Sequence, residues 1–465
     1  MERPPHELEV RNPYDNSTVA KVPLADAQAF DRAADAAVAA APAMARMPAY
    51  ERAALLMHVS GAIAADRENI ARTIAAEAGK PLKDALVETD RAAMTFHVAA
   101  DEARRISGDV IPLDLAPHGA GRIGIVRRFP IGPIAAISPF NFPLNLSAHK
   151  LAPAIAAGNS IVLKPATKTP LSALTLGTLL GEAGAPEGAV SVLPMSRDVG
   201  DRLVTDPRFK LLTFTGSSPV GWAMKARAGR KKVILELGGN AGVIVNDDAD
   251  VMFAAKRVAA GGFSFAGQSC ISVQRVYVHE RVFEAFASEL VRLVEALKVG
   301  DPLDAATDVG PMIEEDEAAR VDHWVRDAVA AGARVLTGGR RLGGAIYAPT
   351  VMADVPSHAK VCTEEVFAPL VGLWRFSKFE DAVAEVNRSR FGLQAGVFTR
   401  DLAGAFLAYE ALEVGGVIIN DVPAWRIDHM PYGGIKESGL GREGPRYTIE
   451  EMTEPKLMVI NRTTS

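Results

Sequence analysis

The chain has 465 residues, of which 48% are hydrophobic and 23% are charged, and its formal net charge is −5. A chain of this length is expected to fold as two or more domains, and its mild acidity gives no basis for binding nucleic acid through the whole surface. Two cysteines, Cys270 and Cys362, exclude a disulfide framework and a cysteine-rich metal site, and no ligand-spaced pair of histidines occurs, so no metal is expected.

The N-terminal part of the sequence predicts helices and no export signal. The segment MERPPHELEV lacks the charged and then apolar pattern of a secretion signal. No uninterrupted apolar run of about 18 residues occurs, so we expect no membrane span and a reducing, cytoplasmic environment. Residues 26–106 are rich in alanine, and their apolar positions recur at helical spacing, with a break at Gly79-Lys80-Pro81. This pattern predicts packed amphipathic helices.

From Arg122 onward, strand-like runs alternate with helix-like runs. The segment GRIGIVRRFPIGPIAAISP is β-like, and NSIVLKP, GAVSVLP, KLLTFTG and KKVILELGG are each predicted to form a strand before or after a helix. The rhythm predicts a doubly wound parallel sheet. A second alternating block starts shortly after Leu237 and indicates a second α/β domain. The final run, EPKLMVINR, is predicted to be a lone strand far from its own sheet, of a kind that pairs with a neighbouring subunit.

Two glycine-containing stretches are candidate anion sites. GAGRIG (Gly119, Gly121, Gly124) matches the dinucleotide-binding pattern GxGxxG, but that pattern needs a helix after it and IVRRFPIGP cannot form one. We therefore predict a hairpin turn there. In LLTFTGSSPVG a strand turns at Gly216 and Ser217 into a helix, whose free backbone N–H groups suit a phosphate. The alternative is an ordinary joint in which Ser217 only caps the helix.

Four residues have side chains suited to catalysis or ligand binding. Cys270, in AGQSCISVQ, is a nucleophile or a packed thiol. Glu236 ends an apolar strand before two glycines and is a general base or a solvated charge. Asn141, in SPFNFPLN, is a donor to a developing oxyanion or a turn residue. Lys164 ends SIVLK and points into a ligand crevice or into solvent.

Seven motifs occur together in one order and spacing. They are PFNFP, GNSIVLKPA, FTGS, ELGGN, GQSC, EEVFAPL and MPYGGIKESGLGRE. On these motifs the chain resembles the aldehyde dehydrogenase superfamily from about Asn12 to Ile460. The resemblance implies an α/β fold with a Rossmann-like cofactor domain, an α/β catalytic domain and a small β oligomerisation element. It also implies a family that binds its dinucleotide without a GxGxxG loop.

The resemblance implies domain boundaries as well. We expect the dinucleotide-binding domain in residues 1–114 and 137–237, the catalytic domain in residues 238–430, and the oligomerisation or bridging element in residues 115–136 and 445–465. The hairpin around GAGRIG and the C-terminal strand fit that bridge. A homodimer or homotetramer is therefore the expected assembly.

Roles for individual residues follow from the same resemblance. Cys270 is the implied nucleophile, Glu236 the general base, and Asn141 the oxyanion donor together with the Cys270 backbone N–H. An aldehyde is then oxidised to the carboxylic acid through a thiohemiacetal and a thioester on Cys270, and water activated by Glu236 hydrolyses the thioester. The implied cofactor is NAD or NADP. Its implied contacts are Lys164 at the adenosine ribose, Gly216 and Ser217 at the phosphates, and Glu365 and Phe367 at the nicotinamide half.

One departure from the family pattern bears on the choice of cofactor. NAD-preferring members commonly carry Glu three residues after the ribose-binding lysine, where this sequence has Thr167 followed by Lys168. A carboxylate there would repel the 2′-phosphate of NADP, and threonine removes that repulsion. We therefore predict that NADP is accepted. The alternative is that TKTP is only a surface helix cap.

The class of substrate is inferred from residues near the implied mouth of the pocket. His149 stands eight residues after Asn141, where many relatives carry an aromatic residue, and Arg426 and Tyr432 lie in the loop before GGIKESG. A histidine and an arginine there favour a small polar or anionic aldehyde, as in a lactaldehyde-dehydrogenase-like branch. Structurally, His149 could instead cap a helix and Arg426 could pair with Asp428. The residues flanking the nucleophile, Ser269 and Ile271, complete the predicted substrate set.

Two other functions compete with hydrolytic aldehyde oxidation. In a CoA-acylating dehydrogenase a thiol rather than water takes the acyl group, and such relatives often lack the general base, so Glu236 counts against this function. A non-enzymatic scaffold protein would not require Cys270, Glu236 and Asn141 together.

Overall fold

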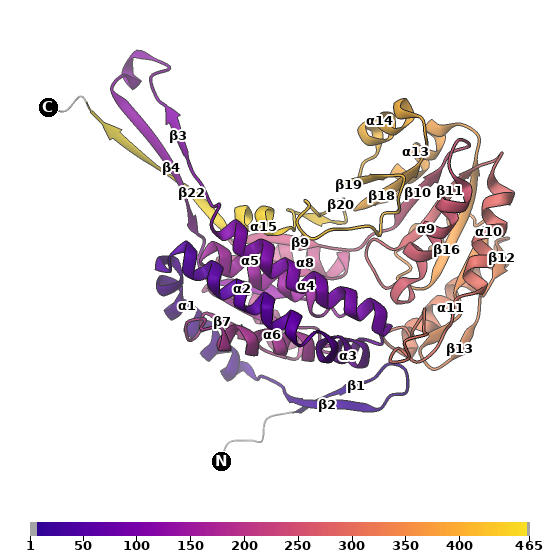
Figure 1. Ribbon diagram of the computed structural model, residues 1–465, viewed down its shortest axis with the longest axis horizontal. Helices are drawn as coiled ribbons and strands as arrows, with labels where there is room; N and C mark the ends of the chain where they lie inside the picture. The colour runs from indigo at the N-terminus through magenta and orange to yellow at the C-terminus, as the bar shows by residue number, and fades with distance from the viewer. Residues whose placement is uncertain (1–6, 463–465) are drawn as a thin grey trace.

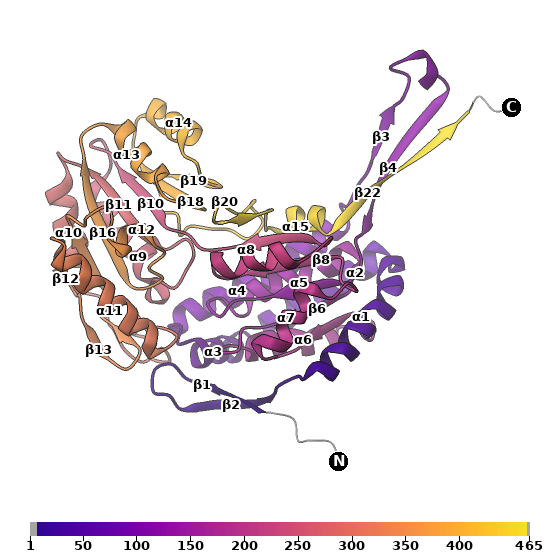
Figure 2. The same cartoon turned by 180° about the vertical axis from the view of Figure 1, so that it is seen from behind.

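The computed structural model describes residues 7–462 (Figure 1). The prediction about a secretion signal concerns residues 1–6 in part, and the predicted bridge includes residues 463–465; both stretches lie outside the described residues. Two large β-sheets organise the chain, and a third sheet of three strands projects from them as an arm (Figures 1 and 2). The predicted α/β class is confirmed.

The first large sheet follows the predicted parallel arrangement. In spatial order its six strands are β21 (Gly439–Leu440), β9 (Lys232–Glu236), β8 (Leu211–Thr215), β5 (Ile134–Ile137), β6 (Ile161–Lys164) and β7 (Val190–Val192). Every neighbouring pair is parallel except β21 with β9, which is antiparallel. Because β21 comes from near the C-terminus, the chain returns to its first sheet after building the second.

The second large sheet contains the later strand–helix block. In spatial order its seven strands are β12 (Arg334–Thr337), β15 (Thr350–Ala353), β16 (Leu370–Phe376), β11 (Val273–His279), β10 (Ala241–Val245), β18 (Gln394–Phe398) and β19 (Gly416–Ile419). Only the edge strand β12 is antiparallel to its neighbour. The sheet is therefore of the predicted parallel type with one antiparallel edge.

Helices cover both large sheets. The α-helices of residues 7–462 are α1 (Ala27–Arg46), α2 (Ala49–Ala65), α3 (Arg67–Ala78), α4 (Leu82–Ala103), α5 (Asn145–Ala157), α6 (Leu171–Glu182), α7 (Arg197–Thr205), α8 (Ser218–Arg227), α9 (Val251–Phe263), α10 (Phe283–Glu295), α11 (Glu315–Ala330), α12 (Lys360–Thr363), α13 (Phe379–Asn387), α14 (Leu402–Ala411) and α15 (Pro445–Glu451). None of these described helices is long and apolar enough to cross a membrane.

Alternation along each strand sends neighbouring side chains into different cores. In β5, Ile134 and Ala136 pack into the core with α2, α4 and α5, whereas Ala135 and Ile137 pack on the other face with residues of α1 and α7. The alanine-rich helices predicted in residues 26–106 thus supply one layer, because small side chains let helices approach closely. The break predicted after Ala78 is confirmed: Gly79 ends α3 with φ +69°, the left-handed conformation that glycine adopts readily.

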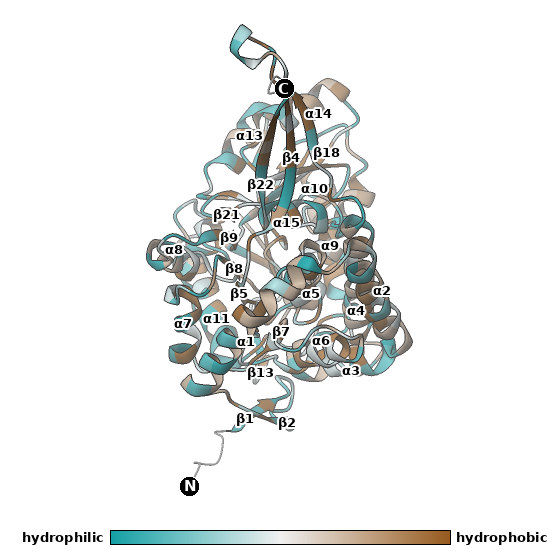
Figure 3. Ribbon diagram, turned by 90° about the vertical axis from the view of Figure 1, so that its left-hand side faces the viewer, coloured by the Kyte–Doolittle hydropathy of each residue, from teal (hydrophilic) through white to brown (hydrophobic). Residues whose placement is uncertain are grey.

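The projecting arm corrects the prediction for the C-terminal strand. Its strands are β22 (Thr453–Asn461), β4 (Arg122–Pro130) and β3 (Asp109–Pro112). β22 is no lone strand, because it pairs antiparallel with β4 of the same chain from Thr453–Pro130 to Asn461–Arg122. Apolar stretches run along β4 and β22 (Figure 3), and Leu457 to Ile460 are 42–53% exposed.

The GxGxxG match lies in this arm and not beside a nucleotide-binding helix. Gly119 ends a short 3₁₀ turn, η1 (Pro117–Gly119), Gly121 has φ +75°, and Gly124 lies within β4. The predicted hairpin turn is confirmed, since β3 and β4 pair antiparallel on either side of it.

Short two-stranded ladders and one further 3₁₀ turn complete the fold. They are β1 (Glu7–Arg11) with β2 (Thr18–Pro23), β13 (Arg341–Gly343) with β14 (Ile346–Tyr347), β17 (Phe391–Gly392) with β20 (Ile435–Lys436), and η2 (Ser264–Gly267).

Candidate active site

The loop that carries Cys270 joins η2 to β11 and has a strained backbone. Phe265, Ala266 and Gly267 have φ values of +46°, +54° and +68°, which for the first two is an uncommon left-handed conformation. The buried Gln268 fixes this run: its side-chain amide lies 3.3 Å from the carbonyl oxygens of Phe265 and Pro311, and its Oε1 accepts from the Ile313 amide at 2.8 Å. The nucleophile candidate is therefore held on a preorganised loop.

Asn141 lies against the same loop, in the segment between β5 and α5. Its side chain is buried, and Nδ2 donates to the Gln268 carbonyl at 3.0 Å. In the part of the chain that the structure describes, the Cys270 backbone N–H donates no hydrogen bond. The second hydrogen of Asn141 Nδ2 and this amide are thus unused donors, and Asn141 and Cys270 line one cavity.

Glu236 is the last residue of β9 and is a buried carboxylate without hydrogen bonds. It is 3% exposed, and neither carboxylate oxygen has a partner among the described residues. Burial, and then the charge of Glu443, raise the pKa of Glu236 well above its ordinary value. Gly433 lets the chain approach this side chain, because a Cβ there would lie 2.8 Å from Glu236 Oε1.

Two glycines after Glu236 bring three segments together. A Cβ on Gly239 would lie 2.1 Å from the Cys270 carbonyl oxygen, and one on Gly238 would lie 2.4 Å from Glu365 Oε2. The Gly239 amide donates to Glu365 Oε1 at 2.8 Å. Burial raises the pKa of Glu365 to about 7. A Cβ on Gly239 would meet backbone, whereas one on Gly238 would meet the end of the flexible Glu365 side chain, so Gly239 above all sets the distance between the base candidate and the nucleophile loop.

One cavity of about 470 Å³ joins most of the predicted site residues. It is lined by Asn141, Lys164, Gly216, Ser217, Glu236, Cys270, Glu365 and Phe367. The first five come from the six-stranded sheet and its connections, and the last three come from segments of the seven-stranded sheet. The cavity therefore lies where the two sheets meet, at the carboxyl ends of β6, β8 and β9.

The part of this cavity near α8 fits a phosphate-bearing dinucleotide. Ser217 occupies the N-cap position of α8, yet its side chain makes no capping bond and is exposed, so its hydroxyl and the first amides of the helix are free to bind an anion. The stem of Lys164 lies against Gly200 of α7, where a Cβ would come within 2.4 Å of Lys164 Cδ. Burial lowers the pKa of Lys164, and its ammonium donates to the Pro165 carbonyl at 3.3 Å.

Phe367 lines the same cavity on the side of the seven-stranded sheet. Its backbone has φ +51°, and its ring packs edge-on against Phe140, with ring centroids 5.8 Å apart. Phe140 directly precedes Asn141, so an aromatic pair bridges the two halves of the cavity. The residues present thus fit a dinucleotide.

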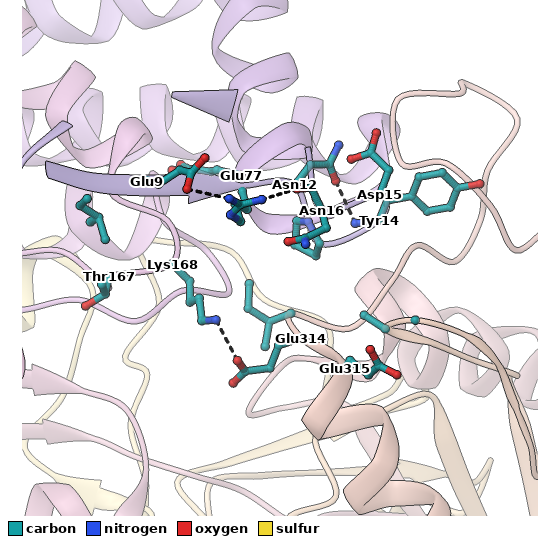
Figure 4. A pocket seen from close by; sticks show the side chains of 16 residues that line it. Glu9, Asn12, Tyr14, Asp15, Asn16, Glu77, Thr167, Lys168, Glu314 and Glu315 are labelled. Atoms are coloured by element: carbon teal, nitrogen blue, oxygen red, sulfur yellow. Dashed lines mark hydrogen bonds and ion pairs between the residues drawn. The ribbon is translucent and has the colours of Figure 1, made fainter. Parts of the chain in front are cut away.

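Thr167 lies outside the cavity of Cys270. It is exposed and lines a neighbouring cavity of about 550 Å³, which Lys168 and Glu314 share with the first one. Lys168 Nζ pairs with Glu314 Oε2 at 2.8 Å across the boundary, while the Thr167 hydroxyl points away from that ion pair (Figure 4).

Predicted substrate residues form the other surroundings of Cys270. Tyr432 Oη lies 2.8 Å from Cys270 Sγ, and Ile271, Leu393 and Tyr432 form a small apolar cluster with the cysteine side chain. Ser269 points elsewhere and lines a minor cavity beside Gly239. Burial raises the pKa of the Cys270 thiol to about 12, although the Tyr432 hydrogen bond acts against this rise.

His149 and Arg426 belong to a buried polar network. His149 lies in the middle of α5 and is fully buried, so the alternative that it caps a helix is wrong; its Nε2 lies 2.9 Å from Asp428 Oδ1 and 3.3 Å from Arg426 Nη2. Arg426 Nη2 donates to Glu443 Oε2 at 3.3 Å, and Arg426 Nε lies 3.8 Å from Asp428 Oδ1, as the pairing alternative predicts. Burial alone would lower the pKa of Arg426, but the Glu443 and Asp428 carboxylates hold it above its ordinary value.

Arg91 and Lys150 also belong to this network and were not predicted. Arg91 of α4 makes a two-pronged contact with Asp428, at 2.8 and 3.0 Å. Lys150 of α5 is buried, donates to the hydroxyls of Thr213 and Thr215 at 3.1 and 2.8 Å, and lies 3.7 Å from Glu443 Oε1. The available signal was the pair His149-Lys150 inside an otherwise apolar helix; Arg91 gave none, because α4 has an ordinary amphipathic pattern.

Comparison with known proteins agrees with this geometry. The family model "Aldehyde dehydrogenase family" matches residues 1–458. The 3-sulfolactaldehyde dehydrogenase of Priestia aryabhattai is 44% identical over 455 residues, which cover 98% of this chain and 95% of that protein.

Solved structures agree as well. The aldehyde dehydrogenase 21 of Physcomitrella patens, in complex with the reaction product succinate, is 51% identical with a TM-score of 0.98, covering 100% of this chain and 97% of that one. The glyceraldehyde-3-phosphate dehydrogenase of Methanocaldococcus jannaschii DSM 2661, complexed with NADP, is 39% identical with a TM-score of 0.94, covering 98% and 99%. The predicted fold is confirmed, and the chain belongs to the aldehyde dehydrogenase family as an NAD(P)-dependent aldehyde dehydrogenase.

Proposed function

We propose that the chain oxidises a small anionic aldehyde to the carboxylic acid, with Cys270 as nucleophile, Glu236 as general base and Asn141 as oxyanion donor. One observation carries this proposal: the three side chains line a single cavity with Lys164 and Ser217, although they come from three separate segments of the chain. An ordinary buried thiol would not need an unpartnered buried carboxylate in the same cavity.

In the first step, the Cys270 sulfur attacks the aldehyde carbon. The thiol proton moves to Glu236, whose raised pKa makes its carboxylate a strong base, and the C–S bond forms. The carbonyl oxygen becomes negative and is stabilised by Asn141 Nδ2–H and the Cys270 backbone N–H. Losing one such donor typically costs about 3–4 kcal/mol of transition-state stabilisation.

The second half of the reaction restores the enzyme. When bound, oxidised NAD or NADP supplies the hydride acceptor that turns the thiohemiacetal into a thioester. Glu236, having released the first proton, then accepts one from water as the water attacks the thioester carbon, and the C–S bond breaks to give the acid and the free thiol. The enclosed position of Glu236 supports this second task, since it limits the carboxylate to water inside the cavity.

We propose that NADP is accepted, because no carboxylate stands at Thr167. Thr167 and Lys168 are exposed and follow shortly after Lys164 in the chain, which supports this proposal. The NADP complex of the Methanocaldococcus jannaschii relative supports it as well. The Lys168–Glu314 ion pair is half-exposed, so it is weak enough to exchange for a phosphate.

An anionic substrate is supported by the arginines behind Tyr432. Arg426 lies over the Tyr432 ring at 3.7 Å, and Arg91 reaches the same Asp428 carboxylate as Arg426. Guanidinium groups bind carboxylates and sulfonates well. The relatives named for sulfolactaldehyde and bound to succinate handle anions of this class, which supports the lactaldehyde-like branch.

We further propose that residues 1–114 with 137–237, residues 238–430, and residues 115–136 with 445–465 act as cofactor, catalytic and bridging parts. The exposed apolar arm of β4 and β22 supports a homodimer or homotetramer. The two free thiols fit a reducing cytoplasm.

A CoA-acylating function is the second candidate, and the buried Glu236 argues against it. One experiment tests both functions. Rapid mixing of enzyme, NADP and succinate semialdehyde should give a burst of reduced cofactor, seen by absorbance, equal in amount to the Cys270 present, followed by steady turnover without CoA. Turnover only with CoA would favour the second function. A Cys270→Ser variant that oxidises aldehyde at the parent rate would overturn the proposal.

A further inference from the structure

The segment that precedes β20 is pressed against both reacting groups. Tyr432 places its hydroxyl 2.8 Å from Cys270 Sγ, and its neighbour Gly433 leaves room for Glu236 only because it has no Cβ. Two consecutive residues thus face the nucleophile candidate and the base candidate. The position of this dipeptide sets how both side chains lie in the cavity.

Tyr432 is itself held on three sides. Its backbone pairs with Glu443, with N–H···O distances of 3.0 and 2.6 Å in the two directions. The Arg426 guanidinium lies 3.7 Å from the ring centroid, and the ring packs against Ile271 and Leu393. A tyrosine fixed in this way has no freedom to turn its hydroxyl away from Cys270, so the contact with sulfur is preorganised.

The Arg426 charge also changes the chemistry of the phenol. A cation over the π-face draws electron density from the ring, which strengthens the hydroxyl as a hydrogen-bond donor. A donor 2.8 Å from sulfur stabilises the negatively charged form of sulfur more than the neutral thiol. Against this, burial and the carboxylates of Glu365 and Glu236 destabilise the thiolate.

We infer that Tyr432 is a positioning residue that holds the Cys270 sulfur through its hydroxyl and stabilises the thiolate from which the reaction starts. The inference rests on the proposed role of Cys270 as nucleophile. It assigns to Tyr432 a task beyond lining the substrate side. The titratable and charged groups that face Cys270 are Tyr432, Glu365, Arg426 and Glu236.

The test measures the thiol itself and not turnover alone. Full-length parent and Tyr432→Phe are alkylated with iodoacetamide across a pH series, and modification of Cys270 is followed by peptide mass spectrometry, with Cys362 as an internal reference. Tyr432→Phe keeps the ring under Arg426 and removes only the oxygen. We expect the pH midpoint of Cys270 alkylation to rise by about one unit, so that the rate below the midpoint falls about tenfold, while Cys362 is unchanged.

Tyr347→Phe is the matched control, because Tyr347 is buried and its hydroxyl has no hydrogen-bond partner among the described residues. It should leave the Cys270 profile unchanged. In turnover, Tyr432→Phe should slow the hydride burst and leave the KM for NADP at the parent value, which separates a positioning role from loss of the fold. A Tyr432→Phe variant with the parent alkylation profile would overturn the inference.

A second measurement serves if Tyr432→Phe folds poorly. Replacing all seven tyrosines by 3-fluorotyrosine makes each phenol more acidic, so the Cys270 midpoint should fall in the otherwise unchanged chain. An unchanged midpoint would contradict the inference. An active Cys270→Ser variant would overturn the proposed nucleophile, whereas an inactive Cys270→Ser variant together with a parent-like Tyr432→Phe profile would overturn only the role of Tyr432.

Discussion

Glu236 is the residue whose environment is hardest to explain without catalysis. A buried carboxylate without a hydrogen bond costs stability, and proteins keep such groups mainly at functional sites. Lys150 and Arg426 lower its pKa, but burial and Glu443 dominate and raise it. The network behind Glu236 therefore holds a base that is strong and incompletely neutralised.

The pH dependence of turnover should report this base. Because the pKa of Glu236 is raised, thioester hydrolysis should fall as pH drops through that raised value, where the protonated carboxyl no longer accepts a proton from water. In Glu236→Gln, hydrolysis should fall by roughly 10²–10⁴-fold and lose this pH dependence, and the acyl group should accumulate on Cys270. Steady-state rates across pH and intact-protein mass spectrometry measure both effects. Glu437→Gln, at a half-exposed carboxylate nearby, is the control; a Glu236→Gln variant with the parent pH profile would contradict the assignment.

We expect Thr167 to influence how tightly the enzyme binds the 2′-phosphate of NADP. In Thr167→Glu, the new carboxylate beside Lys168 should repel that phosphate, so kcat/KM for NADP should fall by at least about tenfold while the value for NAD stays the same or rises. Thr167→Gln has a similar size and no charge, and should behave as the parent. Both cofactors are compared by initial rates. A parent with no measurable turnover with NADP would end this prediction.

Arg426 should set the preference for anionic aldehydes. In Arg426→Gln, the ratio of kcat/KM for succinate semialdehyde to that for butyraldehyde should fall by at least about tenfold, because the positive charge behind Tyr432 is removed. The ratio is the informative quantity, since loss of a buried cation beside Asp428 and Glu443 also lowers the folded fraction, which affects both substrates equally. An unchanged ratio would show that Arg426 serves only the buried network.

Among the elements, those with a plain period in sequence were predictable. The strands β6, β8 and β9 coincide with apolar runs close to Gly or Pro, β11 coincides with the run VQRVYVH, and the helices of residues 26–106 follow their apolar spacing. α5 was not predicted, because prolines at its start and inside it hide a fully buried helix. The pairing of β22 with β4 was missed for a different reason. More than 300 residues separate the two strands, and local sequence patterns do not indicate pairing between such distant segments.

The same limit applies to the site. Cys270, Glu236 and Asn141 each belong to a recognisable motif, whereas the contact of Tyr432 with Cys270 depends on how the chain returns from the second sheet to the first through β21. Arg91 was invisible because its partner Asp428 is far away in sequence. The motifs therefore predict which residues belong to the site, whereas the contacts between these residues are seen only in the folded structure.

The turn after β9 is the element on which the spacing of the site depends. Gly239→Ala would place a Cβ 2.1 Å from the Cys270 carbonyl oxygen, so the nucleophile loop must move. We expect kcat to fall by about 10²-fold, since small displacements at reacting groups have effects of that size. Gly181→Ala in α6 is the matched control: nothing lies within 4 Å of its added Cβ, and alanine favours the helix. Burst amplitude and melting temperature are measured for both variants, and an active Gly239→Ala would mean that the loop adapts.

In the whole molecule, the cavity lies where two sheets meet and the arm lies away from both (Figure 1). The arm differs from the cavity because its apolar side chains are exposed to solvent. Leu457 to Ile460 expose alternate side chains on both faces of β22, and the strand forms an edge of its sheet. An exposed apolar edge strand promotes association with another protein surface. A second copy of the same chain is the simplest partner, because most oligomers are symmetric assemblies of identical chains.

We therefore expect the parent to be a dimer or tetramer that the arm holds together. The double variant Met458→Glu with Ile460→Glu places two charges on one face of β22. Burying these charges against a partner subunit would be unfavourable, and the variant would also lose the free energy of burying two apolar side chains. Size-exclusion chromatography with light scattering should show a smaller species for this variant. Met252→Glu, at a methionine that is 57% exposed on α9 and outside the arm, should keep the parent mass. A monomeric parent, or an unchanged assembly in the double variant, would place the subunit contacts elsewhere, because the arm would then tolerate charge where a partner is expected.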